Sequence, residues 1–207
     1  MTVEYLPTGI KCNLACTYCY QEPMREAGNY SAPLNFVRVK EAIIKGGNGF
    51  SLFGGEPLLA SLAHLQEVFE FGDSIGNNNG IQTNGLLVNS AHIELFKKHK
   101  VQVGISIDGP GICNSARGSD SDTELIISNI KRLLASHVSV SLIVTIHALN
   151  YHGMDDLLAF LDSMESLGVG SVNFHNLEVD NAATAENLKL TDSENTAAFL
   201  MLYDHMR

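Results

Sequence analysis

The sequence predicts an α/β fold built on a parallel β-sheet, and three observations lead to this class. Extended apolar segments and segments with helical spacing alternate along the chain. One strand and the helix after it take about 30 residues, the usual length of a strand followed by a crossover helix. The strand-like segments are apolar and rich in β-branched residues, as strands are when helices cover the sheet. Such alternation implies parallel strands joined by right-handed crossovers.

Six segments have the length and composition of buried strands. The segment at 138–145, Val-Ser-Val-Ser-Leu-Ile-Val-Thr, is typical of them. We predict strands at residues 3–8, 50–54, 80–83, 101–107, 138–145 and 169–175.

Six further segments have helical spacing; in the segment at 58–71, apolar residues recur every three or four positions. We predict helices at residues 36–45, 58–71, 91–99, 123–136, 154–167 and 192–206. Two helix starts carry a capping-box pattern, Ser121 with Glu124 and Thr191 with Glu194. The stretch at 178–190 is irregular and is predicted to be a long loop.

The number of units leaves two architectures open. A closed barrel of eight units usually needs about 250 residues, and only six units fit into 207 residues. The sequence is therefore compatible with an open, doubly wound sheet or with an incompletely closed barrel of six units. The local pattern does not separate these two folds.

Composition and charge narrow the functional classes. With 45% hydrophobic and 17% charged residues, the chain is predicted to form one domain around one core. The formal net charge of −10 argues against nucleic acid and anionic membrane surfaces as partners. The start of the chain lacks a secretory signal pattern, and no apolar stretch approaches the roughly 20 residues that span a bilayer. These features predict a cytoplasmic protein.

Unusual residues follow four consecutive predicted strands. The first strand leads into Lys-Cys-Asn-Leu-Ala-Cys-Thr-Tyr-Cys-Tyr at 11–20, and the second into Gly-Gly-Glu-Pro at 54–57. The third leads into Gln-Thr-Asn-Gly at 82–85, and the fourth into Ser-Ile-Asp-Gly-Pro at 106–110. In parallel α/β folds the site lies at the carboxyl ends of the strands, so these segments are expected to meet there.

The strongest signal is the spacing of Cys12, Cys16 and Cys19. A structural zinc site normally takes four protein ligands, so three thiolates on one loop leave a position open. A 4Fe-4S cluster held by three cysteines likewise keeps one iron free for a chelating small molecule. The alternative is a zinc site that a distant histidine or Cys113 completes.

This cysteine loop resembles that of the radical S-adenosylmethionine (SAM) enzymes, with Tyr18 as the aromatic residue between the last two cysteines. The Gly-Gly-Glu-Pro segment at 54–57 is similar to the family motif for the SAM amino group. The resemblance implies a (β/α)6 partial TIM-type barrel with parallel strands. It also implies a 4Fe-4S cluster on Cys12, Cys16 and Cys19, with SAM on the open iron.

Within that family, the segments at 82–85 and 104–110, followed by Arg117, resemble the SPASM/twitch subgroup of peptide- and protein-modifying enzymes. By this resemblance Ser106 binds the ribose of SAM, Arg117 pairs with its carboxylate, and Tyr18 gives a backbone contact to adenine. A guanidinium suits a carboxylate because both are planar and pair through two hydrogen bonds. The resemblance thus implies SAM contacts at Tyr18, Gly54, Gly55, Glu56, Asn84, Ser106 and Arg117.

Simpler interpretations remain open for several of these residues. The glycines and proline at 54–57 suit a turn, and Glu56 suits the cap of the following helix. The ring of Tyr18 can pack the loop, Arg117 can be a solvated loop residue, and Asp108 suits a tight turn.

The later strands carry further polar residues that could line the mouth of the fold, by which we mean the carboxyl ends of the strands, but the signal for them is weaker. The sequence identifies no general base. A histidine without a known partner is more often structural than catalytic, and a leftover thiol such as Cys113 is most often inert. The candidates are Thr145, His147, Asn150, Asn173, His175, Asn176 and Glu178.

SPASM proteins carry a C-terminal extension whose cysteines bind auxiliary clusters, and this chain has only Cys113 to spare. We therefore expect residues 1–207 to be the radical SAM core and an auxiliary-cluster domain to be absent from this chain. The resemblance implies an oxidoreductase that cleaves SAM and abstracts hydrogen from a peptide or protein substrate, with flavodoxin or ferredoxin as a typical electron donor. The alternatives are a glycyl-radical enzyme activase and a non-enzymatic zinc-binding module.

Overall fold

The computed structural model describes residues 3–29, 35–46, 49–177 and 183–207. Its centre is one six-stranded sheet in which every neighbouring pair is parallel. The strands are β1 (Val3–Tyr5), β2 (Phe50–Leu52), β3 (Gly80–Thr83), β4 (Gln102–Ser106), β5 (Val140–Ile146) and β6 (Ser171–Asn176). All six predicted strands are confirmed, with ends that differ by up to three residues.

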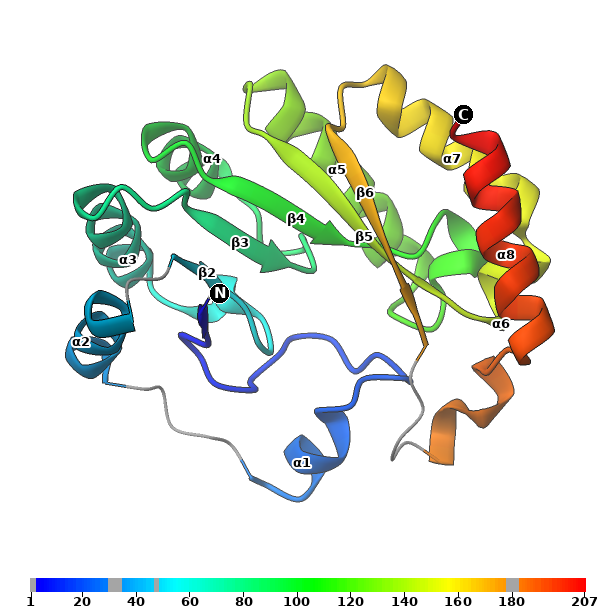
Figure 1. Cartoon of the computed structure of the whole chain (residues 1–207), viewed down its shortest axis with the longest axis horizontal. Coiled ribbons are helices and arrows are strands. Elements are labelled where there is room, and N and C mark those ends of the chain that lie inside the picture. Colours follow the sequence, from blue (N-terminus) through cyan, green and yellow to red (C-terminus); the bar gives the residue numbers. More distant parts are fainter. Residues whose placement is uncertain (1–2, 30–34, 47–48, 178–182) are drawn as a thin grey trace.

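The strand order decides between the two architectures. The sheet runs β1-β2-β3-β4-β5-β6, so each crossover advances by one strand in the same direction. A doubly wound sheet reverses direction at a switch point, and this one does not. Among the described strands β1 and β6 are unpaired with each other, so the sheet stays open. The predicted (β/α)6 partial barrel is confirmed, and Figure 1 shows most of the helices outside the curved sheet.

Six helices match the predicted ones, although several boundaries differ. The predicted helix at 58–71 begins later, because Pro57–Leu59 forms a 3-10 turn (η1) and Ser61 caps the helix that follows. These six helices are α2 (Phe36–Gly46), α3 (Leu62–Ser74), α4 (Ser90–Lys98), α5 (Asp120–Ala135), α7 (Met154–Ser166) and α8 (Asp192–His205).

The predicted capping box of Ser121 with Glu124 is wrong. Helix α5 starts earlier, and Ser119 Oγ accepts from Asp122 N at 3.2 Å while Asp122 accepts from Ser119 N at 2.9 Å. The box of Thr191 with Glu194 is confirmed. The predicted long loop is wrong in part, because Ala183–Leu188 forms a 3-10 segment (η3); residues 178–182 lie outside the described part of the chain.

Alternating burial gives the sheet two different faces. In β5 the side chains of Val140, Leu142, Val144 and Ile146 are buried, whereas the intervening ones are partly exposed. The buried set packs under the helices, since apolar side chains at every second position share one face. Register places Ser106 beside Ile143 and Thr145 beside His175 on the opposite, concave face.

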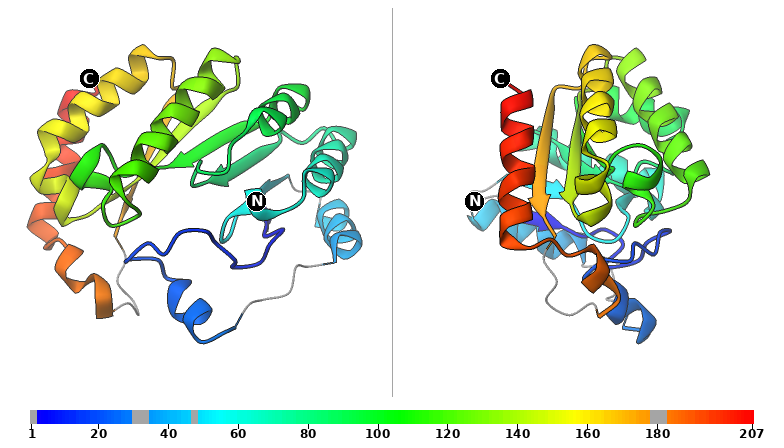
Figure 2. Two further views of the ribbon diagram at one scale, coloured as in Figure 1. Left: turned by 180° about the vertical axis from the view of Figure 1, so that it is seen from behind. Right: turned by 90° about the vertical axis from the view of Figure 1, so that its right-hand side faces the viewer.

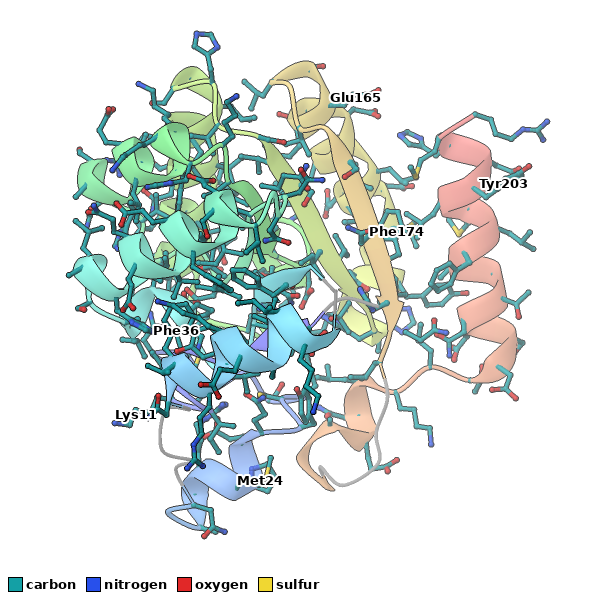
Figure 3. The ribbon with its side chains drawn as sticks, turned by 60° about the vertical axis from the view of Figure 1, so that its left-hand side comes forward. Lys11, Met24, Phe36, Glu165, Phe174 and Tyr203 are labelled. Carbon is teal, nitrogen blue, oxygen red and sulfur yellow. The ribbon has the colours of Figure 1, made fainter. Side chains whose placement is uncertain are left out.

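Helix α8 lies at the end of the sheet, next to β6 and α7 (Figures 1 and 2). His205 near its end is 2.7 Å from Asp162 of α7. Figure 3 shows Phe174 of β6 next to this helix and Tyr203 on its far side. No helix in the described residues combines the length and apolar character needed to cross a membrane.

Candidate functional site

The glycines at 54 and 55 hold the segment that leads into the cysteines. Gly55 N donates to Gly9 O at 3.2 Å, and Glu56 N donates to Lys11 O at 2.7 Å. A Cβ on Gly55 would lie 2.0 Å from Lys11 O, and Gly54 has a φ of +97°. Only glycine allows both the close approach and this conformation. The turn interpretation of these glycines is therefore correct, and the turn fixes the cysteine loop beside the end of β2.

We expect Gly55→Ala to lower the free energy of unfolding by about 3 kcal/mol or more, because the added methyl meets rigid backbone. Urea denaturation measures this change. Gly170→Ala is the matched control, since its Cβ would meet only Val140 O at 3.7 Å; its expected change is within about 0.5 kcal/mol. Equal stabilities of the two variants would contradict the assigned role.

The cysteine loop is also tied to the segment after β4. Thr17 N donates to Ala116 O at 2.9 Å, and Cys19 N closes a turn onto Cys16 O at 2.9 Å. Cys16 is buried, while Cys12 and Cys19 are partly exposed, and all are free thiols. Burial raises the pKa of Cys16 to about 11 and also raises that of Cys12. Metal binding by Cys12 and Cys16 therefore has to release protons.

The three cysteines lie on one loop at the carboxyl ends of β1, β2 and β4, and Figure 1 shows this segment, in blue, running past the arrowheads of the strands. In the part of the chain that the structure describes, no three His, Cys, Asp or Glu side chains form a site for a single metal ion. A cluster takes its cysteine ligands at separate irons, so a set of thiolates spread along one loop fits it chemically.

Glu56 is fully buried and joins the ends of β2 and β3. Its carboxylate accepts from Thr83 Oγ1 at 2.6 Å, from Asn84 N at 2.8 Å and from Leu58 N at 2.9 Å. Burial raises its pKa, and the three hydrogen bonds hold it down only in part. The capping interpretation is thus confirmed for η1, and a direct contact of Glu56 with SAM stays a prediction.

We expect Glu56→Gln to destabilise the fold by about 2 kcal/mol, because the amide replaces one of the two accepting oxygens with an NH₂ group and leaves at least one buried donor without an acceptor. Chemical denaturation at neutral pH measures the loss. Glu67→Gln serves as the control: Glu67 is half-exposed and pairs with Lys40 at 2.8 Å, and exposed pairs contribute about 0–1 kcal/mol. A neutral effect of Glu56→Gln would show that its hydrogen bonds are dispensable.

Asn84 and Ser106 reach the same mouth from β3 and β4. Asn84 Nδ2 donates to Asn13 Oδ1 at 2.9 Å, which links the end of β3 to the cysteine loop, and lies 3.8 Å from Cys12 Sγ. Ser106 Oγ accepts from Gln82 Nε2 at 3.3 Å on the concave face. Both residues lie at the predicted site, and their contacts with SAM stay predictions.

Tyr18 takes part in a buried polar network that the sequence did not indicate. Its hydroxyl donates to Asp108 Oδ2 and accepts from Arg117 Nη1 at 2.7 Å. Burial raises the pKa of Tyr18 well above its ordinary value, so the hydroxyl stays protonated as a donor. Asp108 is fully buried and also accepts from Thr145 N at 2.9 Å. Tyr18 therefore connects the cysteine loop to the ends of β4 and β5.

Arg117 is largely shielded from water in this network, with 12% of its side chain exposed. Burial pushes its pKa down, but Tyr18, Asp108 and Cys16 more than offset this effect, so its pKa is raised. Its Nε has no hydrogen-bond partner among the described residues. The interpretation as a solvated loop residue is wrong, and the free donor fits an anionic ligand such as a carboxylate.

Some of the weaker candidates from the later strands are buried structural residues, and others lie on the concave face of the sheet. His147 is fully buried, 3.4 Å from Asp108 Oδ2, and its ring packs against that of Tyr18 at 5.7 Å. Asn150 is buried and donates to Thr145 O at 2.8 Å. Cys113 is buried beside Gly153. Register puts Asn173 and His175 on the concave face and Asn176 on the other; Glu178 lies outside the described residues.

Arg25 is a site residue that the sequence analysis missed. It lies on the short helix α1 (Glu22–Glu26), which was also not predicted. Its side chain is buried against the cysteine loop and donates to Cys19 Sγ at 3.2 Å. No motif marks this residue, because the contact depends on where α1 folds back.

Comparison with protein-family models gives one match relevant to this site. The model of the Radical SAM superfamily matches residues 6–161, which include the three clustered cysteines and every residue of the polar network.

The curated relatives include anaerobic sulfatase-maturating enzymes. The serine-type enzyme of Klebsiella aerogenes is 29% identical over 212 residues, covering 94% of this chain and 51% of that protein. The cysteine-type enzyme of Clostridium perfringens is 31% identical over 117 residues, covering 50% of this chain and 32% of that protein. The chain thus spans about half the length of the first of these relatives.

Solved structures share the fold. A structure described as "Native anSMEcpe with bound AdoMet" superposes with a TM-score of 0.81 at 19% identity, covering 98% of this chain and 60% of that one. Streptococcus suis SuiB bound to S-adenosylmethionine gives a TM-score of 0.77 at 15% identity, covering 99% of this chain and 47% of that one. At these identities the likeness shows the fold alone.

Proposed function

The chain belongs to the radical SAM superfamily, and on that premise we propose that it is the core of a radical SAM enzyme that modifies a peptide or protein. The observation that carries this proposal is the cysteine loop, which Gly55, Glu56 and Thr17 fix at the carboxyl ends of the strands. The proposed class is an oxidoreductase of the maturase type.

We assign the cofactors to the residues gathered at this mouth. Cys12, Cys16 and Cys19 would hold a 4Fe-4S cluster, and the segment at 54–56 with Asn84, Ser106 and Arg117 would hold SAM. When bound, the cluster supplies the electron that cleaves SAM to methionine and a 5′-deoxyadenosyl radical, which abstracts hydrogen from the substrate.

The protein's own part is binding and exclusion of water. Arg117 offers a buried, unpartnered Nε–H to the carboxylate of SAM. Ser106 presents its hydroxyl on the concave face, where it suits a ribose oxygen. The side chains on the helix side of β4 and β5 are buried, so this side of the sheet is an apolar layer. A radical formed on the concave face would thereby be kept from bulk water on that side.

A peptide substrate is proposed because the sequence relatives include sulfatase-maturating enzymes and because a fold neighbour was solved with precursor peptide SuiA. The sheet is open between β1 and β6, which gives a polypeptide a way to the mouth. The same proposal includes a one-electron donor such as flavodoxin or ferredoxin. It also includes a cytoplasmic location and an auxiliary-cluster domain outside residues 1–207.

Anaerobic reconstitution of the protein with iron and sulfide tests the proposed function. We expect about four irons and four sulfides per chain, broad brown absorbance, and 5′-deoxyadenosine when SAM and dithionite are added. Chelation of the iron should remove both the absorbance and the product. Stoichiometric zinc without sulfide would overturn the proposal in favour of a zinc module. An organic radical signal on an added glycyl-radical enzyme would move the substrate assignment to an activase.

A further inference from the structure

One guanidinium holds both ends of the cysteine loop. Arg25 Nη1 donates to Ile10 O at 3.1 Å, two residues before Cys12, and Arg25 Nη2 donates to Cys19 Sγ at 3.2 Å. Only 7% of the Arg25 side chain is exposed. The loop is therefore closed by a charged side chain whose hydrogen bonds are largely shielded from water.

The position of this charge is fixed by Glu22 of the same short helix. Arg25 Nε donates to Glu22 Oε2 at 3.0 Å, and Nη2 also donates to this oxygen. Glu22 is 26% exposed, so its carboxylate remains in contact with water while the guanidinium does not. All three nitrogens of the guanidinium thus have hydrogen-bond partners, and one of these partners is the sulfur of Cys19.

A hydrogen bond to a ligating sulfur changes the redox behaviour of the metal group. Such bonds and nearby positive charge stabilise the reduced cluster, which carries one more negative charge, and so raise its potential. The planar fork of arginine can bind the carbonyl, the carboxylate and the sulfur together, whereas a lysine ammonium acts as a single point charge.

We propose that Arg25 is a positioning residue that raises the reduction potential of the cluster through its N–H···S bond to Cys19, and that Glu22 limits this effect by countercharge. The inference rests on the proposed function, because it requires a cluster on Cys12, Cys16 and Cys19. Reduction adds one electron to the cluster, and no bond forms or breaks.

The test is a dithionite-based redox titration of the reconstituted protein, followed by EPR without SAM. For Arg25→Gln we expect a lower potential, with about tenfold less reduced cluster at a fixed potential, the size of one charge-assisted hydrogen bond. Arg25→Lys, which keeps the charge but not the fork, should lie between Arg25→Gln and the wild type. Glu22→Gln should shift the potential in the opposite direction.

Glu26→Gln is the matched control, because Glu26 is an exposed carboxylate on the same helix; its potential should equal that of the wild type. Unchanged potentials in all variants would overturn the inference. If Arg25→Gln binds no cluster, the reduction potential of Glu22→Gln decides, because this variant keeps the arginine. A higher potential than that of the wild type supports the inference, and an equal or lower potential refutes it. Absence of iron and sulfide from the wild type would instead refute the proposed function, and the inference with it.

Discussion

Cys16→Ala is expected to abolish both iron–sulfide uptake and formation of 5′-deoxyadenosine, whereas Cys113→Ala keeps both. Cys16 is the buried member of the three clustered cysteines, and the loop around it is fixed by the turn of Cys19 onto Cys16 O. In Cys16→Ala only two of the three cysteine ligands remain, so the Fe–S cluster lacks one ligand and is lost. Iron and sulfide analysis, visible absorbance and product assay measure the difference.

Cys113 is a demanding control, because it is also a buried thiol whose pKa burial raises to about 11. It lies in the 3-10 helix η2 (Gly111–Asn114), and its Sγ lies 3.7 Å from Gly153 O. We expect Cys113→Ala to cost about 1 kcal/mol of stability. If both variants lost metal equally, Cys113 would be a fourth ligand, as in the zinc site that Cys113 completes, and the three-cysteine assignment would be wrong.

The fold could be predicted from the sequence because each unit carries its own signal. The alternation of buried strands with amphipathic helices indicated the six strands and the six longer helices in their order, and all of them formed. Strand order could not be derived from local pattern, since the same units build a doubly wound sheet. Short elements such as α1 and α6 (Ala148–His152) were missed because five residues are too few to show a helical period.

The site could be predicted only where residues on one short segment carry the chemistry. The cysteine spacing and the glycines at 54 and 55 are of this kind. The partners of Tyr18 lie 90 and 99 residues away in the sequence, and nothing in a local pattern joins them. The hydrogen bonds of Glu56 could be predicted only in part. Its capping bond to Leu58 is local, whereas its bond to Thr83 joins the ends of two strands.

The link between Tyr18 and Arg117 leads to the second large effect. Asp108 fixes the Tyr18 hydroxyl as a donor, so the oxygen's lone pairs accept from Arg117 Nη1. This bond orients the guanidinium and leaves its buried Nε free. If Nε binds the SAM carboxylate, removal of the hydroxyl should weaken SAM binding without removing the cluster.

For Tyr18→Phe we expect about tenfold weaker binding of SAM to the cluster-loaded protein, because the guanidinium loses the bond that orients it. For Arg117→Lys we expect about a hundredfold, because the donor itself is lost; both are within the range of a charge-assisted hydrogen bond. Equilibrium titration measures both, with iron content unchanged. The double variant should bind no more weakly than Arg117→Lys alone, because Tyr18 acts through the arginine. Tyr20→Phe is the matched control, since Tyr20 is 64% exposed on the same loop. Additive losses in the double variant would mean that Tyr18 contacts SAM independently, and the orienting role would then be rejected.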